Sequence, residues 1–485
     1  MLLIAIFITL LIVLLFIKFI EPLIQLRNVP SVRPWYPLVG NVFLFLGKTG
    51  EQLFVMMNSV FARHDRLFLL WFGIRPVVGV CHPDLIRKVL TSGTCLEKPF
   101  FYRFSRTDQG LWAAKTSLWR HQRKALNATF SPAVLKNFVP IFEAFSKQLV
   151  QDLSQHDGRP IDLLPITLAC TLRMIGNTTM GVDASDESDI VKFVSNMDKI
   201  TEIVSKRFLS VRLHSEQIYR MTPSYKREIE MRQECSDYTM KILDKRKQKT
   251  NSEQPALHKV FIDQLLEESE TGRPFSDTEI VQNVYTMLTA GSETTGRSVA
   301  YACLILAVFP DIQKKVYTEI IGKCSDCTQP LTIDTLAELT YLDAFLKECH
   351  RLYPVAPYIA RESTDSLELD GVTFPKGSVF VFNFFVLHRN DAIWGPESDR
   401  FHPERFLDER YPERSTFGYL PFSAGQRNCI GQRYATISLK VMLVHLVRSY
   451  KIETPLRYED LRFKFGMMLE LSSECLVLFK KREPL

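Results

Sequence analysis

The sequence predicts a mainly helical protein with minor β-sheets, organised as one large domain behind a single N-terminal helix. The longest helical pattern spans residues 280–309, and helical periodicity dominates from residue 84 onward. Short apolar runs broken by turn residues cluster at 66–82 and 366–386, which indicates small hairpins and sheets. Neither a Gly/Ser-rich nor a Pro-rich linker interrupts residues 42–485, so length alone does not require several domains.

Composition restricts the function classes. The chain has 485 residues, 46% of them hydrophobic, which is enough to bury a large core and still enclose a small molecule. The net charge of +6 is small for this length and accompanies no nucleic-acid-binding motif, so nucleic acid is not expected as a partner. The excess indicates either an ordinary mixed surface or a basic face toward anionic lipid or an acidic protein. Ten scattered cysteines do not form the dense framework of a small disulfide-rich protein.

The N-terminus is predicted to be a membrane anchor. Residues 1–20 are almost entirely apolar and, as a helix, span about 30 Å, enough to cross a bilayer core. A cleaved signal peptide is the alternative, but its basic start and small-residue cleavage site are missing. Positive charges follow the apolar run, which places the rest of the chain in the cytosol. Residues 21–41 are rich in proline and are expected to form a stiff, extended linker to a domain over 42–485.

The central helix combines an apolar surface with a short polar stretch. Ser276 and Glu279 form a capping box at its start and Pro310 ends it, giving about 45 Å of helix. Because it is apolar on nearly all sides, it is expected to run buried through the fold. Glu293 and Thr294 interrupt this surface, and burying an acid and an alcohol is costly unless both are satisfied.

A loop near the C-terminus carries the most specific chemical pattern. Residues 421–435 place Cys429 between two glycines, Gly425 and Gly431, just before an apolar helical run. The glycines permit a tight wrap of the backbone through unusual φ values or close approach, and the positive end of the helix favours a thiolate. Phe422 can cover the sulfur, and Arg427 can pair with a cofactor carboxylate. For a lone cysteine, a buried structural role would be the simpler interpretation.

The complete pattern Phe-x-x-Gly-x-Arg-x-Cys-x-Gly resembles the haem-binding loop of cytochromes P-450. The resemblance covers nearly the whole chain, because further motifs of that family follow in the expected order. It implies the cytochrome P-450 fold with the long central helix over haem b. Cys429 would be the metal ligand, with Phe422, Arg427 and Gly431 completing the cofactor loop.

Two further groups of residues match the family. Glu348 and Arg351 stand three apart on one helix face and can pair, and Arg405 in Pro-Glu-Arg-Phe would join them in a buried structural cluster. Trp119 and Arg123 stand four apart and match Trp-x-x-x-Arg, which the family assigns to the haem propionates. The resemblance adds these propionate partners: Arg361, Arg427 and, with the weakest match, Lys98.

The resemblance also implies an activity. Ala290 and Gly291 would leave room for oxygen over the iron, and Glu293 with Thr294 would relay protons. The expected reaction is insertion of one atom of O2 into a C–H bond of a lipophilic substrate. The cysteine ligand donates electron density that favours O–O cleavage.

Electrons must come from another protein, because the chain has no GxGxxG dinucleotide motif. The resemblance implies an NADPH-dependent flavoprotein reductase, with cytochrome b5 as a further candidate. Arg120, Lys124 and Arg433 are expected to help form the docking face. A microsomal type implies the endoplasmic reticulum membrane, with the catalytic domain on the cytosolic side.

Residues 341–354 and 421–435 look most like the fourth-family clan, especially its insect members. Some of that clan bind haem through an ester with a glutamate, where this chain has Ala290. A covalent link of that type is therefore not expected, and fatty acids, hormone-like lipids and xenobiotics all stay open as substrates. Three alternatives stay open as well: a thiolate-haem isomerase or dehydratase, a non-catalytic haem-binding protein, and a haem-free interaction module.

Overall fold

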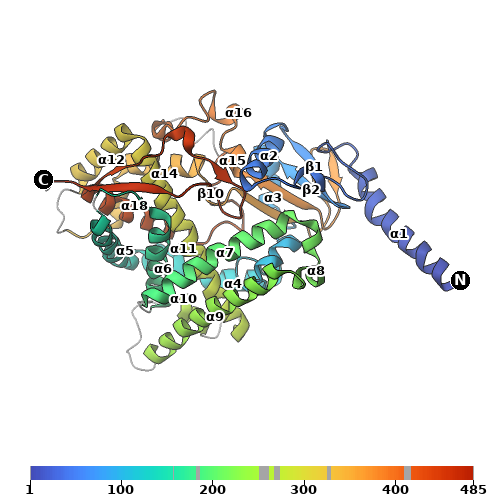
Figure 1. Ribbon diagram of the computed structural model, residues 1–485, viewed down its shortest axis with the longest axis horizontal. Helices are drawn as coiled ribbons and strands as arrows, with labels where there is room; N and C mark the ends of the chain where they lie inside the picture. Colours follow the sequence, from blue (N-terminus) through green and yellow to red (C-terminus); the bar gives the residue numbers. More distant parts are fainter. Residues whose placement is uncertain are drawn as a thin grey trace.

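The computed structural model describes residues 2–156, 158–181, 186–250, 261–266, 274–324, 329–408 and 417–483. Helices form most of these segments, and short strands form the rest, as the sequence predicted. Figure 1 shows the first helix extending away from the body of the molecule, a β-rich part beside it, and a helical part that carries the C-terminus at the far end.

The described helices, in chain order, are α1 (Leu2–Gln25), α2 (Gly50–Ala62), α3 (Pro83–Thr91), α4 (Thr116–Leu126), α5 (Pro132–Leu153), α6 (Leu163–Met180), α7 (Glu187–Leu209), α8 (Glu216–Arg220), α9 (Pro223–Thr250), α10 (Phe261–Leu266), α11 (Asp277–Val308), α12 (Pro310–Lys323), α13 (Ile333–Ala337), α14 (Thr340–Leu352), α15 (Phe384–Leu387), α16 (Asp391–Trp394) and α18 (Gln432–Ser449). Two 3-10 helices also matter for the site, η2 (Phe100–Ser105) and η6 (Pro403–Phe406).

The strands form small sheets. They are β1 (Leu67–Phe72), β2 (Arg75–Val80), β3 (Ile161–Asp162), β4 (Tyr358–Glu362), β5 (Leu367–Leu369), β6 (Val372–Phe374), β7 (Val379–Asn383), β8 (Tyr450–Glu453), β9 (Phe463–Lys464), β10 (Glu470–Leu471) and β11 (Leu476–Lys481). A four-stranded sheet has the order β1-β2-β7-β4, and a three-stranded sheet has the order β3-β11-β8. The predicted hairpin at 66–82 is β1 with β2, paired from Leu67 and Val80 to Phe72 and Arg75.

The central helix is α11, and its start is capped as predicted. The Ser276 side chain accepts from the Glu279 N–H, and the Glu279 carboxylate accepts from the Ser276 N–H at 2.7 Å. The C-terminal half of α11, from Ser292 to Ala307, is buried almost without interruption, and the helix packs along α6. Because α5, α12, α14 and α18 surround this pair, α11 forms the axis of the helical part (Figure 1).

The N-terminal segment differs from its prediction in two ways. Helix α1 runs through Pro22 to Gln25, beyond the expected end at residue 20. Residues 26–41, expected as an extended spacer, instead turn back onto the sheet: the Val32 N–H donates to Leu69 O at 2.9 Å, and Asn41 Nδ2 donates to the carbonyls of Val32 and Pro34. The buried apolar residues Leu26, Val29 and Val32 give the segment a core contact that a solvated spacer lacks.

Within the part of the chain that the structure describes, no single helix is both long enough and apolar enough to cross a membrane. Only taken together do α11 and α12 have the required length and composition, and they are bent at 113° to one another. The buried environment of α11 already accounts for its apolar composition.

Candidate active site

The loop around Cys429 is wound tightly before α18. Gly425 has φ +73°, and a Cβ there would lie 1.9 Å from Leu90 O, so the position admits only glycine. The Cys429 N–H donates to Phe422 O at 3.0 Å, and the Asn428 N–H donates to Gly425 O at 3.1 Å. These two bonds close the loop and place the thiol three residues before α18 begins.

Gly431 does not have the unusual φ that was one of the two possibilities predicted for it. Its φ is −88°, which any residue adopts, and a Cβ there would lie 3.9 Å from Cys429 Sγ. The residue is the N-cap of α18, and its backbone N–H faces the thiol. Desolvation by the surrounding protein raises the pKa of Cys429 above its ordinary value, although the residue is exposed, while that N–H and the charge of Arg123 act to lower the pKa. Gly431 therefore contributes a donor and the absence of bulk, not an unusual backbone angle.

Three cations converge beside this loop. Arg361 on β4 and Arg427 are buried, and desolvation lowers the pKa of both, as it does for Lys98. Each lies close enough to another to repel it, since Arg361 also acts to lower the pKa of Lys98 and Arg427. Within the described residues, none of the three forms an ion pair with an acidic side chain. Arg427 Nη1 is buried there without a hydrogen-bond partner.

Helix α4 brings the Trp119–Arg123 pair to the same place. The Arg427 guanidinium lies over the Trp119 ring, 4.3 Å from its centroid, and donates from Nη2 to Ala114 O at 2.6 Å. Arg123 donates to the backbone and side-chain oxygens of Asn428 at 2.8 and 2.9 Å. The predicted pair therefore contacts the loop at two neighbouring residues, Arg427 and Asn428.

A cluster of charged residues lies near the cysteine loop. Arg351 donates to both oxygens of Glu348, and Arg405 Nε donates to Glu348 Oε1 at 3.0 Å. The His402 N–H donates to the same oxygen at 2.7 Å. The three residues, predicted from two motifs, are therefore in one hydrogen-bonded group.

His388 connects this cluster to the cysteine loop. Its Nε2 accepts from the Leu420 N–H at 2.8 Å, which requires the proton on Nδ1, and Nδ1 donates to Arg351 O at 3.1 Å. Burial lowers the pKa of His388 to about 3, so it stays neutral in this bridging tautomer. His388 was not predicted, because a single histidine in an apolar run belongs to no recognisable motif.

Helix α11 sends its polar residues in different directions. Thr294 Oγ1 donates to Ala290 O at 2.7 Å, and Ala290 is exposed. A Cβ on Gly291 would lie 2.7 Å from Ile175 Cγ1 on α6. The expectation that Gly291 leaves open space is therefore wrong: its lack of a side chain lets α11 approach α6, and Ala290 and Thr294 share the open face.

Glu293 is turned away from that face. It is buried, and its Oε1 lies 3.4 Å from Arg297 Nη2, which in turn donates to Asp198 Oδ1 at 2.7 Å. Desolvation raises the pKa of Glu293 to about 7, with Arg297 opposing the rise and Asp198 and Glu470 adding to it. Arg297 was not predicted, although an arginine four residues after a glutamate on an apolar helix indicates a pair on one helix face.

A narrow cavity lies between α11 and the cysteine loop. Thr294, Thr295 and Ser298 line it from α11, and Pro421 and Phe422 line it from the loop. His350 of α14 also lines it and contacts the Phe422 ring at 5.4 Å between centroids. Thr294 and the cysteine loop therefore face one space from opposite sides.

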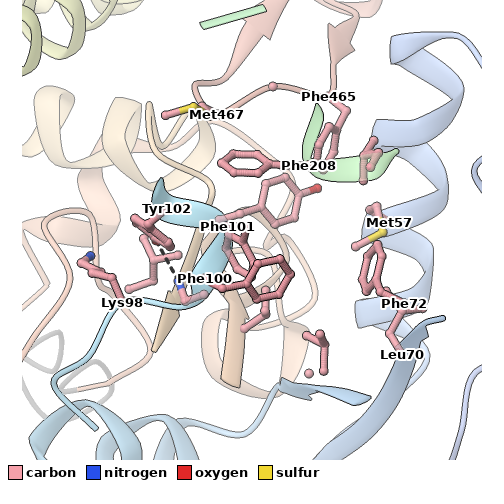
Figure 2. Close-up of a pocket in the computed structure, with 18 of the residues that line it drawn as sticks. Met57, Leu70, Phe72, Lys98, Phe100, Phe101, Tyr102, Phe208, Phe465 and Met467 are labelled. Atoms are coloured by element: carbon pink, nitrogen blue, oxygen red, sulfur yellow. Dashed lines mark hydrogen bonds between the residues drawn. The ribbon is translucent and has the colours of Figure 1, made fainter. Parts of the chain in front are cut away.

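A second, larger cavity lies between the sheet and η2 and is almost wholly apolar. Figure 2 shows Phe100 and Phe101 of η2, Phe208 of α7 and Phe465 directed into it, with Met57 and Phe72 on the opposite wall. The Ala360 N–H donates to Tyr102 Oη at 3.1 Å, which fixes the inner end of η2 beside β4 (Figure 2). Lys98 lies at the same end and also belongs to the cationic group.

Charged residues join the two segments that supply these aromatic rings. Glu216 of α8 accepts from Arg106, at the end of η2, at 2.9 Å and from Arg207, in the last turn of α7, at 2.8 Å. These two hydrogen bonds outweigh desolvation and hold the pKa of Glu216 at about 2. The wall of the large cavity is therefore held by ion pairs between η2, α7 and α8.

Comparison with known proteins settles the family. The cytochrome P450 family model matches residues 30–477. Cytochrome P450 4c21 of Blattella germanica is 32% identical over 460 residues, covering 92% of this chain and 91% of the relative. Human cytochrome P450 4V2 is 29% identical, covering 94% and 90%. A relative named cytochrome P450 4e5, mitochondrial, of Drosophila mettleri is 30% identical, covering 86% and 82%.

The chain belongs to the cytochrome P450 family. It is a haem-thiolate monooxygenase of the fourth-family type, and it works with redox partner proteins, O2 and a lipophilic substrate. Its cofactor is haem b, bound through a cysteine thiolate.

The residues of the site fit that cofactor. A haem brings two carboxylates, and the cationic group provides desolvated partners together with the unpartnered Arg427 Nη1. The narrow cavity has the cysteine loop on one side and the hydroxyl-bearing face of α11, with Thr294, on the other.

Proposed function

We propose that Cys429 is the thiolate ligand and that the protein oxygenates C–H bonds of a lipophilic substrate with electrons from an NADPH-dependent flavoprotein reductase. The observation that carries this assignment is the cysteine loop, closed by the Gly425 turn, facing Thr294 across the narrow cavity. Bound there, the haem supplies oxygen activation, and the protein supplies orientation and protons. Thr294 and Glu293 are the proposed proton-handling residues, and Ala290 marks the oxygen groove.

The propionates are assigned to the cationic group. Arg361 and Arg427 would each gain an anion that relieves their mutual repulsion, with Lys98 beside them. Trp119 stacks under Arg427, and Arg123 holds the Asn428 segment. Ala290 carries no carboxylate, so the haem is held without an ester and only the bond from Cys429 to iron is covalent.

The large cavity is the proposed substrate site. Its aromatic and aliphatic lining excludes strongly polar molecules, because their polar groups would lose water without new partners. It includes the Lys98–Tyr102 end, next to the cationic group that is assigned to the haem propionates. Fatty acids, hormone-like lipids and neutral xenobiotics all meet these conditions.

The redox partner is proposed to dock on the side of Cys429. Arg120 and Lys124 on α4 and Arg433 on α18 are exposed, and Arg123 joins α4 to the cysteine loop through Asn428. An acidic reductase, or cytochrome b5, would bind these charges on the two helices that adjoin the cysteine loop. Reversing all three charges should slow reduction and remove its salt dependence, whereas an unchanged rate would exclude this face.

Residues 1–20 are proposed to anchor the protein in the endoplasmic reticulum membrane, with the domain over 42–485 in the cytosol and 21–41 between them. The described apolar side chains of α1 from Leu2 to Val13 are exposed, and so are Tyr36, Leu38 and Phe43. A concentration of exposed apolar side chains of this kind is typical of lipid contact. Fractionation of cells that express the full chain and a chain lacking residues 1–20 tests the location.

The ligand assignment is tested with the full-length protein in detergent. The carbon-monoxide difference spectrum of the reduced wild type should show a strongly red-shifted Soret band, and Cys429→Ser should lack it. Cys235→Ser is the matched control, because Cys235 is also a buried free cysteine and belongs to α9, an element with no residue in the loop or the narrow cavity. If Cys429→Ser kept the band, the ligand would be misassigned. Product formation that needs NADPH, reductase and O2 then separates a monooxygenase from an isomerase, which needs none of them.

A further inference from the structure

Arg297 is a buried charge in the middle of α11. Its side chain is 2% exposed, and within the described residues Nε has no hydrogen-bond partner. An unpaired guanidinium at this depth would cost several kcal/mol, so its position depends on the carboxylates around it. Those are Glu293, one turn earlier on α11, and Asp198 on α7.

The two carboxylates differ in their access to water. The Asp198 side chain is 55% exposed, whereas that of Glu293 is 6% exposed. Both meet the same guanidinium nitrogen, Nη2, at 2.7 and 3.4 Å. Arg297 therefore joins a solvent-facing group on α7 to the buried acid next to Thr294.

We propose that Arg297 is a positioning residue that holds Glu293 at the buried end of a proton path whose outer end is Asp198. This rests on the proposed role of Glu293 and Thr294. In each transfer the protonated Glu293 side chain turns from the Arg297 side toward the Thr294 face, gives its proton there, and returns as a carboxylate to pair with Arg297. A proton from solvent on the Asp198 side then restores the acid. Arg297 keeps its own proton throughout, because a guanidinium does not deprotonate in proteins.

The charges around Glu293 set the pH at which this path operates. Arg297 favours the carboxylate, while Asp198 on α7 and Glu470 on β10 favour the acid. Tyr285 and Tyr301, also on α11, are neutral because burial raises the pKa of both phenols. With its pKa raised to about 7, Glu293 exists in both forms near neutral pH, as a relay requires.

The first test titrates Glu293 directly and needs no turnover. The infrared band of its protonated carboxyl, identified by subtraction of the Glu293→Gln spectrum, is followed against pH in the holoprotein. Arg297→Gln should move the midpoint up by about one pH unit or more, because a close positive charge is lost. Asp198→Asn should move it down, because a negative charge is lost at an exposed position that does not threaten folding. Arg297→Lys should stay near the wild type.

The second test follows the path during reduction. With reductase, NADPH and no added substrate, the hydrogen peroxide released per NADPH consumed should rise with pH as Glu293 loses its proton. The midpoint of that rise should shift as the infrared midpoint does, upward in Arg297→Gln and downward in Asp198→Asn. Arg173→Gln, which breaks the ion pair with Glu187 elsewhere on α6, is the control and should match the wild type.

Equal infrared midpoints in all variants would overturn the proposal, and so would shifted midpoints with an unchanged peroxide profile. Failure of the proposed function is distinguishable, because it shows in the wild type first: the red-shifted carbon-monoxide band or the NADPH-dependent reaction would be missing before any variant is compared.

Discussion

Arg351 donates two hydrogen bonds to Glu348, at 2.7 and 2.8 Å, and neither side chain is exposed. The remaining guanidinium donors of Arg351 reach the carbonyls of His388, Ser398 and Arg400. The pair therefore connects α14 to three backbone carbonyls between residues 388 and 400. Through His388 it also reaches Leu420, next to the cysteine loop.

Glu348→Gln should destabilise the protein by about 3–5 kcal/mol, because it leaves the buried guanidinium of Arg351 and the partly exposed one of Arg405 without their anion. The thermal midpoint should fall, and less haem should remain after purification. Glu338→Gln is the control, since it removes a carboxylate from a surface pair with Lys323 in which both side chains are more than half exposed. A stable Glu348→Gln protein with full haem content would contradict a supporting role for the cluster.

Gly425→Ala should disrupt the cysteine loop, and Gly371→Ala should not. Both glycines have φ +73°, so both substitutions carry the same left-handed strain of about 1–3 kcal/mol. Only at position 425 does the new Cβ meet a carbonyl, Leu90 O at 1.9 Å, whereas nothing lies within 4 Å at 371. The reduced carbon-monoxide spectrum measures the outcome: the thiolate band should be lost in Gly425→Ala and kept in Gly371→Ala. Equal spectra would show that the loop relaxes around the clash.

Local patterns predicted some features of this fold well and others poorly. The capping box at Ser276, the hairpin of β1 and β2, and the Glu348–Arg351 pair depend on short sequence distances, so spacing alone predicted them. The contact of Gly291 with Ile175 depends on which face of α11 meets α6, and a helix that is apolar all round does not reveal that face. The packing of residues 26–41 on the sheet depends on contacts with distant strands, which composition cannot show.

The candidate site divides in the same way. The cysteine loop and its motif partners were predicted because each residue belongs to a fixed spacing. The stacking of Arg427 on Trp119 and the pairing of Arg207 with Glu216 depend on tertiary contacts alone. Neither contact could therefore be predicted from sequence spacing. His388 and His350 were missed for the same reason, since each acts through residues far away in the chain.

Lys98→Met should stabilise the haem-free protein and weaken haem binding. Desolvation holds the pKa of Lys98 well below its ordinary 10.5, with Arg361 and Arg427 adding to the effect, so the charged form opposes folding. The wild-type apoprotein should therefore gain stability as the pH rises toward 10.5, and the variant should lack this gain. When propionates are bound the sign reverses, because the cation then gains an anionic partner.

Two measurements separate these effects: thermal unfolding of the apoprotein between pH 7 and 10, and the rate of haem transfer to apomyoglobin. A merely structural lysine would lower stability and haem retention together. Lys88→Met, at a surface position on α3, is the control and should change neither. Faster haem loss with a stabler apoprotein is the combination that identifies a propionate partner.

Glu216→Gln should loosen the wall of the large cavity. The carboxylate, with its pKa held at about 2 by Arg207 and Arg106, stabilises the folded state above its ordinary pKa of 4.5 and loses this effect as the pH falls toward 2. The glutamine cannot pair with both arginines, and Arg207 is buried against the rings of Phe104 and Tyr219. Hydrogen exchange should therefore rise in η2, in α8 and at the end of α7 at neutral pH.

The same variant should change the kinetics of substrate entry. With the two segments less firmly joined, a lipophilic ligand should enter faster and leave faster, so the association and dissociation rates of spectral binding should both increase. Glu202→Gln is the control, because Glu202 pairs with Lys206 on the exposed side of α7, one turn before Arg207. If exchange in η2 and the ligand rates matched those of Glu202→Gln, the ion pairs would not hold the wall, and the aromatic contacts between Phe101, Phe104 and Phe208 would be enough by themselves.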